Sequence, residues 1–377
     1  MRTIWVLIPF VLISCAKYDS PGSYLALLAL QSGNSVSVAP WAVPAFRYRN
    51  KIVFGTSHSA LLNNHTVSVT FDSRTSGGQV QLASGNDVRI YWQPASGSAV
   101  ELDRVGSTWN SATTSIDFRL QAALAQNLNE PADGSYYVYF GNASAGTPPI
   151  NEMNVYYFAD FFDRANSTTV GNGWTEWNGA SRDMYIQSGA LAETGNDQVM
   201  DAGVKQTFPL GPIPSDFTLR FDWGVVGVVQ ATWTQFVQIG DSTSMLNTNM
   251  TTGAGPSIYF GEGNGIVPDI LYNMDYKFAA AGQLENTVLP NDAAAFQVLA
   301  IRLVVNTTAQ TYNYYRNNTL IYSGATYENP VTNLNQIRIA MDNWGAGLTA
   351  YTYDNVRVSL SVADDPEMSL GALEIVP

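Results

Sequence analysis

The chain has 377 residues and a single cysteine, Cys15, so it cannot form an intrachain disulfide. An exported domain without disulfides must be stabilised by its hydrophobic core. Charged residues make up 13% of the chain, well below the roughly 25% of a typical soluble domain. The 18 lysines and arginines are outnumbered by 31 acidic residues and form no basic cluster. This composition argues against a nucleic acid partner.

Long apolar runs are also missing, because no segment after Cys15 reaches the 18 or more apolar residues of a membrane-spanning helix. The run from Ile4 to Ile13 has ten residues, which is too short to cross a bilayer. It follows Arg2, and a positive start before a short apolar run is typical of a cleavable export signal. We therefore expect the chain to leave the cytoplasm.

The export signal ends in Leu12-Ile13-Ser14-Cys15, which resembles the lipobox of bacterial lipoproteins. The resemblance implies a signal peptide over residues 1–14 and acylation of Cys15. Two or three acyl chains would anchor the protein stably in a membrane. Cys15 is followed by Ala16 and Lys17, without the aspartate that retains enteric lipoproteins in the inner membrane, so the resemblance implies a surface-exposed outer-membrane protein. The alternative is an ordinary signal peptide with a chance cysteine.

Beyond a tether over residues 15–42, short alternating runs separated by Gly, Asn, Asp and Ser predict an all-β protein. We predict two antiparallel β-sandwiches, the first over residues 43–157 and the second, a jelly roll, over residues 158–361. Residues 362–377 are acidic and poor in strand signals, so we predict a tail there.

Both predicted sandwiches resemble known families. The first is similar to the bacterial family of unknown function numbered 2341, through Tyr48 to Ile52, Asn86 to Tyr91 and Tyr136 to Ala143. That resemblance implies an exported protein and no known catalytic residue. The second resembles the concanavalin A-like, laminin G-like domains in its opening Asp160 to Asn166 and its closing Tyr353 to Val358. That resemblance implies adjacent first and last strands and a domain that commonly binds glycans, sometimes with calcium.

Catalysis is not expected. Glycan-cutting relatives of this fold carry two carboxylates on one strand, and no such pair occurs in the second region. His58 and His65 fall in a loop-like stretch without further ligands at short spacing, so we interpret them as surface residues and not as a zinc site.

Calcium is the metal that the residue types favour, because hard cations prefer carboxylate oxygens. If the first and last strands of the second region pair, Asp160, Asp163 and Asp354 come together and could hold a structural calcium ion. Aspartates at strand ends also serve as turn residues, which is the alternative.

Aromatic and amide side chains near predicted loops are the candidate ligand contacts, because sugars stack on rings and bind amides through their hydroxyls. Each aromatic residue could instead belong to the core. The candidates are Trp174, Trp177, Trp233, Tyr259, Asn264, Asn343 and Trp344.

These patterns predict a non-catalytic cell-surface lipoprotein whose second domain binds a carbohydrate or a glycosylated partner. A structural envelope component without a glycan site is the first alternative. A glycan-processing enzyme is the second.

Overall fold

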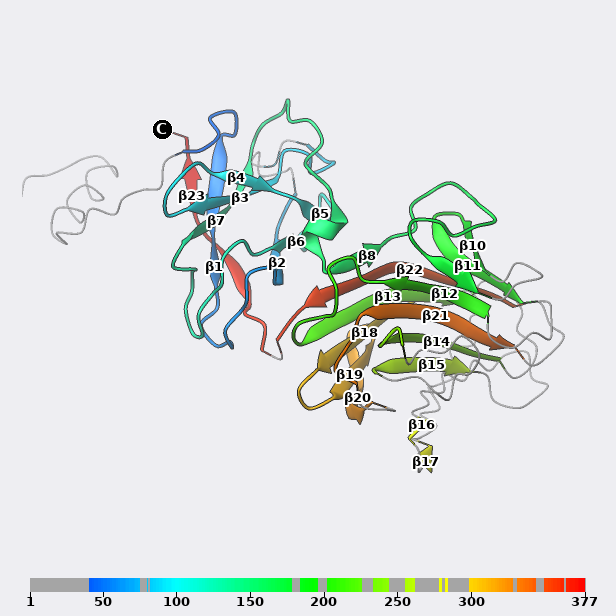
Figure 1. Ribbon diagram of the computed structural model, residues 1–377. Helices are drawn as coiled ribbons and strands as arrows, with labels where there is room; N and C mark the ends of the chain where they lie inside the picture. Colours follow the sequence, from blue (N-terminus) through cyan, green and yellow to red (C-terminus); the bar gives the residue numbers. More distant parts are fainter. Residues whose placement is uncertain are drawn as a thin grey trace, which may run out of the picture. The chain divides into compact units, whose positions relative to one another are not determined.

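The computed structural model describes residues 41–74, 80, 82–177, 184–195, 202–225, 233–243, 255–261, 278–279, 282–283, 298–327, 331–343, 349–362 and 364–376. The predicted signal peptide, Cys15 and nearly all of the tether lie outside these residues. The chain divides into a unit of residues 1–41 and a unit of residues 42–377, and the elements below belong to the second unit. They are almost all antiparallel strands, which confirms the all-β prediction (Figure 1). No helix among these residues is long and apolar enough to cross a membrane.

The first sandwich consists of a five-stranded sheet, β23-β1-β7-β3-β4, and a three-stranded sheet, β2-β6-β5. Burial alternates regularly along β6, and the buried hydrophobic residues of the sandwich form one core. The bounds of its strands are β1 Tyr48–Phe54, β2 Thr66–Phe71, β3 Arg89–Pro94, β4 Val100–Leu102, β5 Arg104–Ser107, β6 Thr114–Arg119, β7 Gly134–Phe140 and β23 Met368–Ile375.

Strand β23 corrects the prediction that residues 362–377 form a strand-poor tail. It pairs with β1 over the whole length of β1, from Tyr48 opposite Ile375 to Phe54 opposite Met368. Its side chains Met368 and Leu370 pack against the first core. The segment has few β-branched residues and contains Gly371, so its sequence predicts a strand poorly. Residues 368–375 form a strand because the backbone groups at the open edge of β1 are available to pair with them.

The second sandwich follows a one-turn helix, α2, over Glu152–Val155. One sheet has the order β10-β11-β22-β13-β18-β19-β20, with β8 paired to β22, and the other has the order β15-β14-β21-β12-β9. A separate two-stranded sheet pairs β16 with β17. The bounds are β8 Phe158–Asp160, β9 Thr175–Trp177, β10 Met184–Gln187, β11 Ala190–Gly195, β12 Ala202–Thr207, β13 Phe217–Val225, β14 Trp233–Gly240, β15 Ser257–Gly261, β16 Phe278–Ala279, β17 Gly282–Gln283, β18 Val298–Asn306, β19 Thr311–Arg316, β20 Thr319–Thr326, β21 Gln336–Asn343 and β22 Thr349–Leu360.

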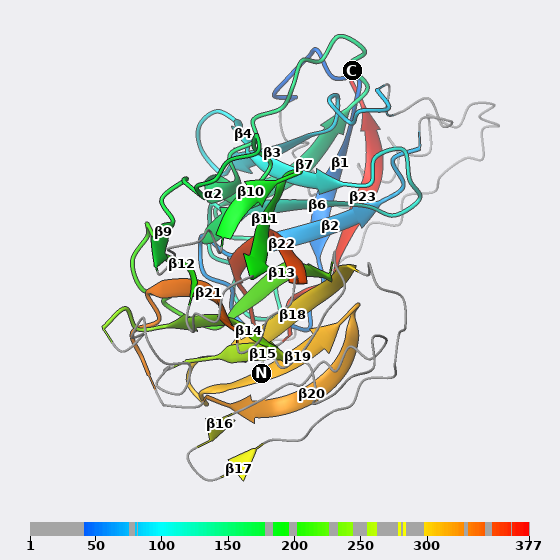
Figure 2. The ribbon, with the colours of Figure 1, turned by 90° about the vertical axis from the view of Figure 1, so that its right-hand side faces the viewer.

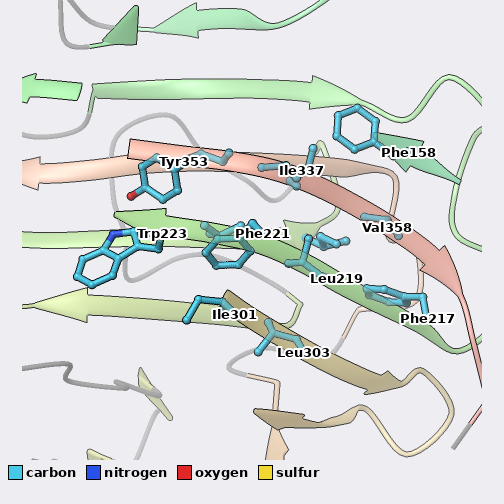
Figure 3. Close-up of a cluster of buried hydrophobic side chains, with 14 of the residues drawn as sticks. Phe158, Phe217, Leu219, Phe221, Trp223, Ile301, Leu303, Ile337, Tyr353 and Val358 are labelled. Atoms are coloured by element: carbon cyan, nitrogen blue, oxygen red, sulfur yellow. The ribbon is translucent and has the colours of Figure 1, made fainter. Parts of the chain in front are cut away.

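The core of the second sandwich lies between its two sheets. On β18 every second residue is buried, so that Ile301 and Leu303 face Ile337 of the opposite sheet (Figure 3). Full burial of such a side chain contributes about 1.5–3 kcal/mol. Figure 2 shows the strands of both sheets from a second direction.

The predicted pairing of the first and last strands of this sandwich is confirmed. Strand β8 pairs with β22, with Phe158 opposite Val358 and Asp160 opposite Val356. This pairing joins the two ends of a segment about 200 residues long and brings the opening and closing motifs of the sequence side by side.

Candidate functional site

Four of the predicted ligand contacts lie on the sheet β15-β14-β21-β12-β9. Trp177 ends β9, Trp233 begins β14, Tyr259 is on β15 and Asn343 ends β21. Trp233 is directly opposite Asn343 in the register. Asn264 and Trp344 lie outside the described residues.

Trp174 is not part of this sheet, and the structure places it in the core. Its side chain is 7% exposed and stacks on Phe162, with ring centroids 5.9 Å apart. Its indole nitrogen donates a hydrogen bond of 2.8 Å to Oδ2 of Asp160. The glycine-rich approach to Trp174 suggested an exposed loop, but the ring turns inward and fills space between aromatic neighbours. Trp174 is therefore unavailable to a ligand.

One row of positions crosses the whole sheet on the face turned away from the core, which we call the aromatic row. It belongs to that face because the neighbouring positions Val204, Val237 and Ile339 are buried in the core and successive residues of a strand alternate between faces. The register runs through Tyr259, Phe236, Ala340, Gly203 and Trp177. Aromatic residues occupy both ends of the row, and small residues lie between them.

Gly203 makes room for Trp177. A Cβ atom on Gly203 would lie 2.6 Å from Cη2 of Trp177 and 2.5 Å from the carbonyl oxygen of Ile339, so no larger residue fits there. The Trp177 ring is half-buried, and in the described part of the chain its Nε1 has no hydrogen-bond partner. Nζ of Lys205 lies 5.8 Å from the Trp177 ring centroid, which is a cation–π contact.

A polar row adjoins the aromatic row on the same face. Its register runs through Ser257, Gln238, Arg338, Lys205 and Thr175. Nε of Arg338 donates a 2.6 Å hydrogen bond to Oε1 of Gln238, and both side chains are buried. Among the described residues, Nε2 of Gln238 has no hydrogen-bond partner.

Sequence reasoning missed Gly203, Lys205, Gln238 and Arg338. These residues come from three strands that are distant in the sequence, and their adjacency exists only once the strands are paired. The alternation of Val204 with Gly203 and Lys205 was the one available signal, because it separates an inner from an outer face.

A calcium ion held by Asp160, Asp163 and Asp354 stays a prediction, and the structure shows the environments of these residues. Among the described residues, no three His, Cys, Asp or Glu side chains are placed to hold a metal ion. Asp160 is 5% exposed and accepts hydrogen bonds from the backbone of Phe162 and from the side chains of Arg164, Asn172 and Trp174. A carboxylate surrounded by four donors is already satisfied and has no free oxygen for a cation.

Asp354 lies in a different environment from Asp160. Burial raises the pKa of the Asp354 carboxyl to about 6, and the nearby carboxylates of Asp163, Asp222 and Asp160 add to that increase. The backbone N–H of Asn355 donates to Oδ1 of Asp354 and acts in the opposite direction. The group is therefore an acidic cluster in which one carboxyl is easily protonated.

Both histidines are buried, which corrects their interpretation as surface residues. Each ring nitrogen of His58 lies within hydrogen-bond distance of a carbonyl oxygen, Nδ1 at 2.6 Å from Ser59 and Nε2 at 2.8 Å from Leu128. Burial lowers the pKa of His65 to about 4. Neither ring nitrogen has a hydrogen-bond partner within the described ranges, and Nε2 lies 3.8 Å from Oδ1 of Asp365. Both residues belong to the interior of the first sandwich.

No family model and no curated protein matches the chain. Among solved structures, it is similar to a sialidase at 12% identity and a TM-score of 0.38, over 70% of this chain and 21% of the sialidase. It is also similar to a Bacillus subtilis protein with a galectin-like fold, at 12% identity and a TM-score of 0.34, over 54% of this chain and 96% of that one. Winged bean acidic lectin matches at 11% identity and a TM-score of 0.31, over 53% of this chain and 98% of the lectin. The chain thus spans about a fifth of the sialidase's length.

Proposed function

We propose that this chain is a non-catalytic, lipid-anchored surface protein whose second sandwich binds carbohydrate at the Trp177–Lys205 edge of the outer face of the sheet β15-β14-β21-β12-β9. The observation that supports the site is the aromatic row lying directly beside the polar row. The accessible part is the edge formed by Trp177 and Lys205, both of which are half-buried.

The chemistry of the two rows suits a sugar. The faces of sugar rings carry C–H groups that pack on aromatic side chains, and Trp177 presents such a ring. Sugar hydroxyls both donate and accept hydrogen bonds, so they can pair with the Lys205 ammonium and the Trp177 indole nitrogen. A few polar groups beside apolar surface are typical of ligand sites.

Glycan-array binding by the full chain tests this proposal. We expect Trp177→Ala to weaken the binding of the preferred glycan by tenfold or more, because aromatic anchors dominate such contacts. Trp92→Ala is the matched control, since Trp92 is also a half-buried tryptophan but lies on β3 of the first sandwich. Absence of glycan binding by the wild type, or unchanged binding by a folded Trp177→Ala variant, would contradict the proposal.

Anchoring rests on the lipobox resemblance and is tested separately. We expect the wild type to enter the detergent phase on Triton partitioning and Cys15→Ser to remain in the aqueous phase, because acylation needs the thiol. A Cys15→Ser variant in the detergent phase would rule out the lipid anchor. Protease treatment of intact cells tests surface exposure, and we expect the wild type to be cleaved.

A further inference from the structure

Three arginines lie side by side on the other sheet of the second sandwich. Arg220 on β13 is directly opposite Arg357 on β22 and directly opposite Arg302 on β18. The alternate positions Leu219, Phe221 and their neighbours face the core, so the three arginines, which we call the arginine row, occupy the outer face. The chain has only 18 lysines and arginines, and three of them stand in this one row.

Such a row opposes folding unless something compensates it, because like charges directly opposite on neighbouring strands repel. Burial lowers the pKa of Arg220, and the charges of Arg357 and Arg302 lower it further. None of the ion pairs formed between described residues involves any of the three guanidinium groups.

The internal contacts of the arginine row leave several donors unused. Nη1 of Arg357 donates to the carbonyl oxygen of Asn355 at 2.9 Å, and Nη1 of Arg220 donates a long bond of 3.4 Å to Ser359. The Arg302 guanidinium stacks on Tyr315, 3.8 Å from the ring centroid. The buried Nε atoms of Arg302 and Arg357 have no hydrogen-bond partner in the described part of the chain.

The negative charges near the row act on Arg220, the middle one of the three arginines. Asp117 of the first sandwich raises the pKa of Arg220, and Arg220 in turn lowers the pKa of Asp365. Asp117 itself accepts hydrogen bonds from Ser68 and Tyr156. Arg302 lies on the other side of Arg220 from Arg357, and it forms no ion pair with a carboxylate in the described residues.

We propose that the arginine row binds a polysaccharide that carries repeated carboxylate or sulfate groups. Guanidinium forks match the geometry of these oxyanions and bind them with charge-assisted hydrogen bonds. Neighbouring strands are about 4.8 Å apart, so the three guanidinium groups span roughly 10 Å. One small anion cannot reach all three, whereas a ligand with repeated anionic groups can.

This site lies on the sheet opposite to the proposed carbohydrate face and does not depend on it. Binding of dextran sulfate, polygalacturonate and neutral dextran to the full chain at low ionic strength tests it. We expect both charged polymers to bind and dextran not to bind. Arg302→Gln should weaken both charged interactions by about tenfold to a hundredfold, the effect of losing hydrogen bonds to a charged group.

Arg316→Gln on β19 is the matched control, because it removes the same charge from a neighbouring strand outside the row, and we expect its binding to stay within twofold of the wild type. Arg302→Lys keeps the charge without the fork, so intermediate affinity is expected, and it replaces Arg302→Gln if that variant does not fold. Equal binding by wild type and both Arg302 variants, or equal losses in Arg316→Gln, would overturn the proposal. Single-stranded DNA binding with the same dependence on Arg302 would also overturn it, by showing a general polyanion surface. Trp177→Ala should leave charged-polymer binding unchanged, which separates the two sites.

Discussion

Asp160 is buried in the second sandwich. Its carboxylate accepts four hydrogen bonds, all from donors that follow it closely in the sequence, between Phe162 and Trp174. Arg164 provides the compensating charge at 2.7 Å, and Trp174 ties the aspartate to the aromatic core. The residue therefore connects the first strand of the second sandwich to its interior. A role in stability follows from this arrangement.

We expect Asp160→Asn to destabilise the second sandwich by about 3–5 kcal/mol, because it leaves the partly buried Arg164 without its counter-charge and turns an amide toward donors. Urea unfolding of the full chain measures the change. Asp163→Asn is the matched control, since Asp163 is exposed three residues away, and its effect should stay well below that of Asp160→Asn. A loss that appears only when calcium is present would instead indicate that Asp160 is a metal ligand.

Replacing Asp354 should have the opposite effect on stability to replacing Asp160. Its pKa of about 6 lies above the ordinary value of 3.8, so ionisation at neutral pH costs stability. We expect Asp354→Asn to stabilise the protein at pH 7.5 by about 1–2 kcal/mol, after allowing for solvent screening, and to have a smaller effect at pH 4.5, where the folded carboxyl is protonated and only the unfolded one is ionised. Unfolding at the two pH values checks this, with the exposed Asp133→Asn as control. A calcium ion bound at Asp354 would reverse the sign, so destabilisation by Asp354→Asn in millimolar calcium would support the metal prediction.

At the scale of secondary-structure elements, β23 matters most. The strand covers the edge of β1. Without β23, the backbone N–H and C=O groups of that edge would be free to pair with other chains. Arg49 of β1 forms an ion pair with Glu374 of β23 at 2.7 Å, and the backbone of Gly55 donates to the carbonyl of Glu367. The first sandwich is therefore complete only after the last strand of the chain has been made.

Two leucines of β23 test its contribution. Leu370 packs against the first core, whereas Leu373 is 38% exposed. We expect Leu370→Ala to destabilise the first sandwich by about 2 kcal/mol and Leu373→Ala by less than about 0.5 kcal/mol. Hydrogen exchange of β1 amides reports the change where it occurs. Equal, small effects of both variants would show that β23 is dispensable.

At the scale of the whole molecule, His65 in the first sandwich and Asp354 in the second should contribute to acid stability in opposite directions. His65 has a pKa of about 4 in the folded protein and about 6.5 when unfolded, so the unfolded chain binds the proton first as the pH falls. Through His65 alone, the first sandwich should lose up to about 3 kcal/mol between pH 6.5 and pH 4. Asp354 acts with the other sign in the second sandwich, where stability is greatest below pH 4 and declines as the pH rises through about 6.

His65→Leu separates the two effects. We expect this variant to remove the acid sensitivity of the first sandwich while leaving the pH dependence of the second unchanged. Asp354→Asn should remove the pH dependence of the second sandwich and leave that of the first unchanged. Hydrogen exchange at pH 7 and pH 4.5 distinguishes the two, because β2 and β22 belong to separate cores. Unchanged acid sensitivity of β2 in His65→Leu would exclude His65 as its cause.

Much of the strand content was predictable from the sequence alone. The alternation of large apolar with polar residues in Thr114–Arg119 and Val298–Asn306 encodes which side of each strand is buried, because side chains on a strand alternate with a period of two. That local rule was sufficient to predict that the protein belongs to the all-β class. The motifs at Asp160 and Tyr353 were sufficient to predict that their two strands pair.

The tertiary structure alone decided which outer faces come together. Period-two alternation assigns a residue to a face but does not say which distant strand lies beside it, so neither the arginine row nor the pairing of the aromatic row with the polar row is visible in the sequence. The same reason explains Trp174 and His65, whose burial depends on neighbours from other strands. It explains β23 as well, because a segment with weak strand propensity becomes a strand when the open edge of β1 is there to receive it.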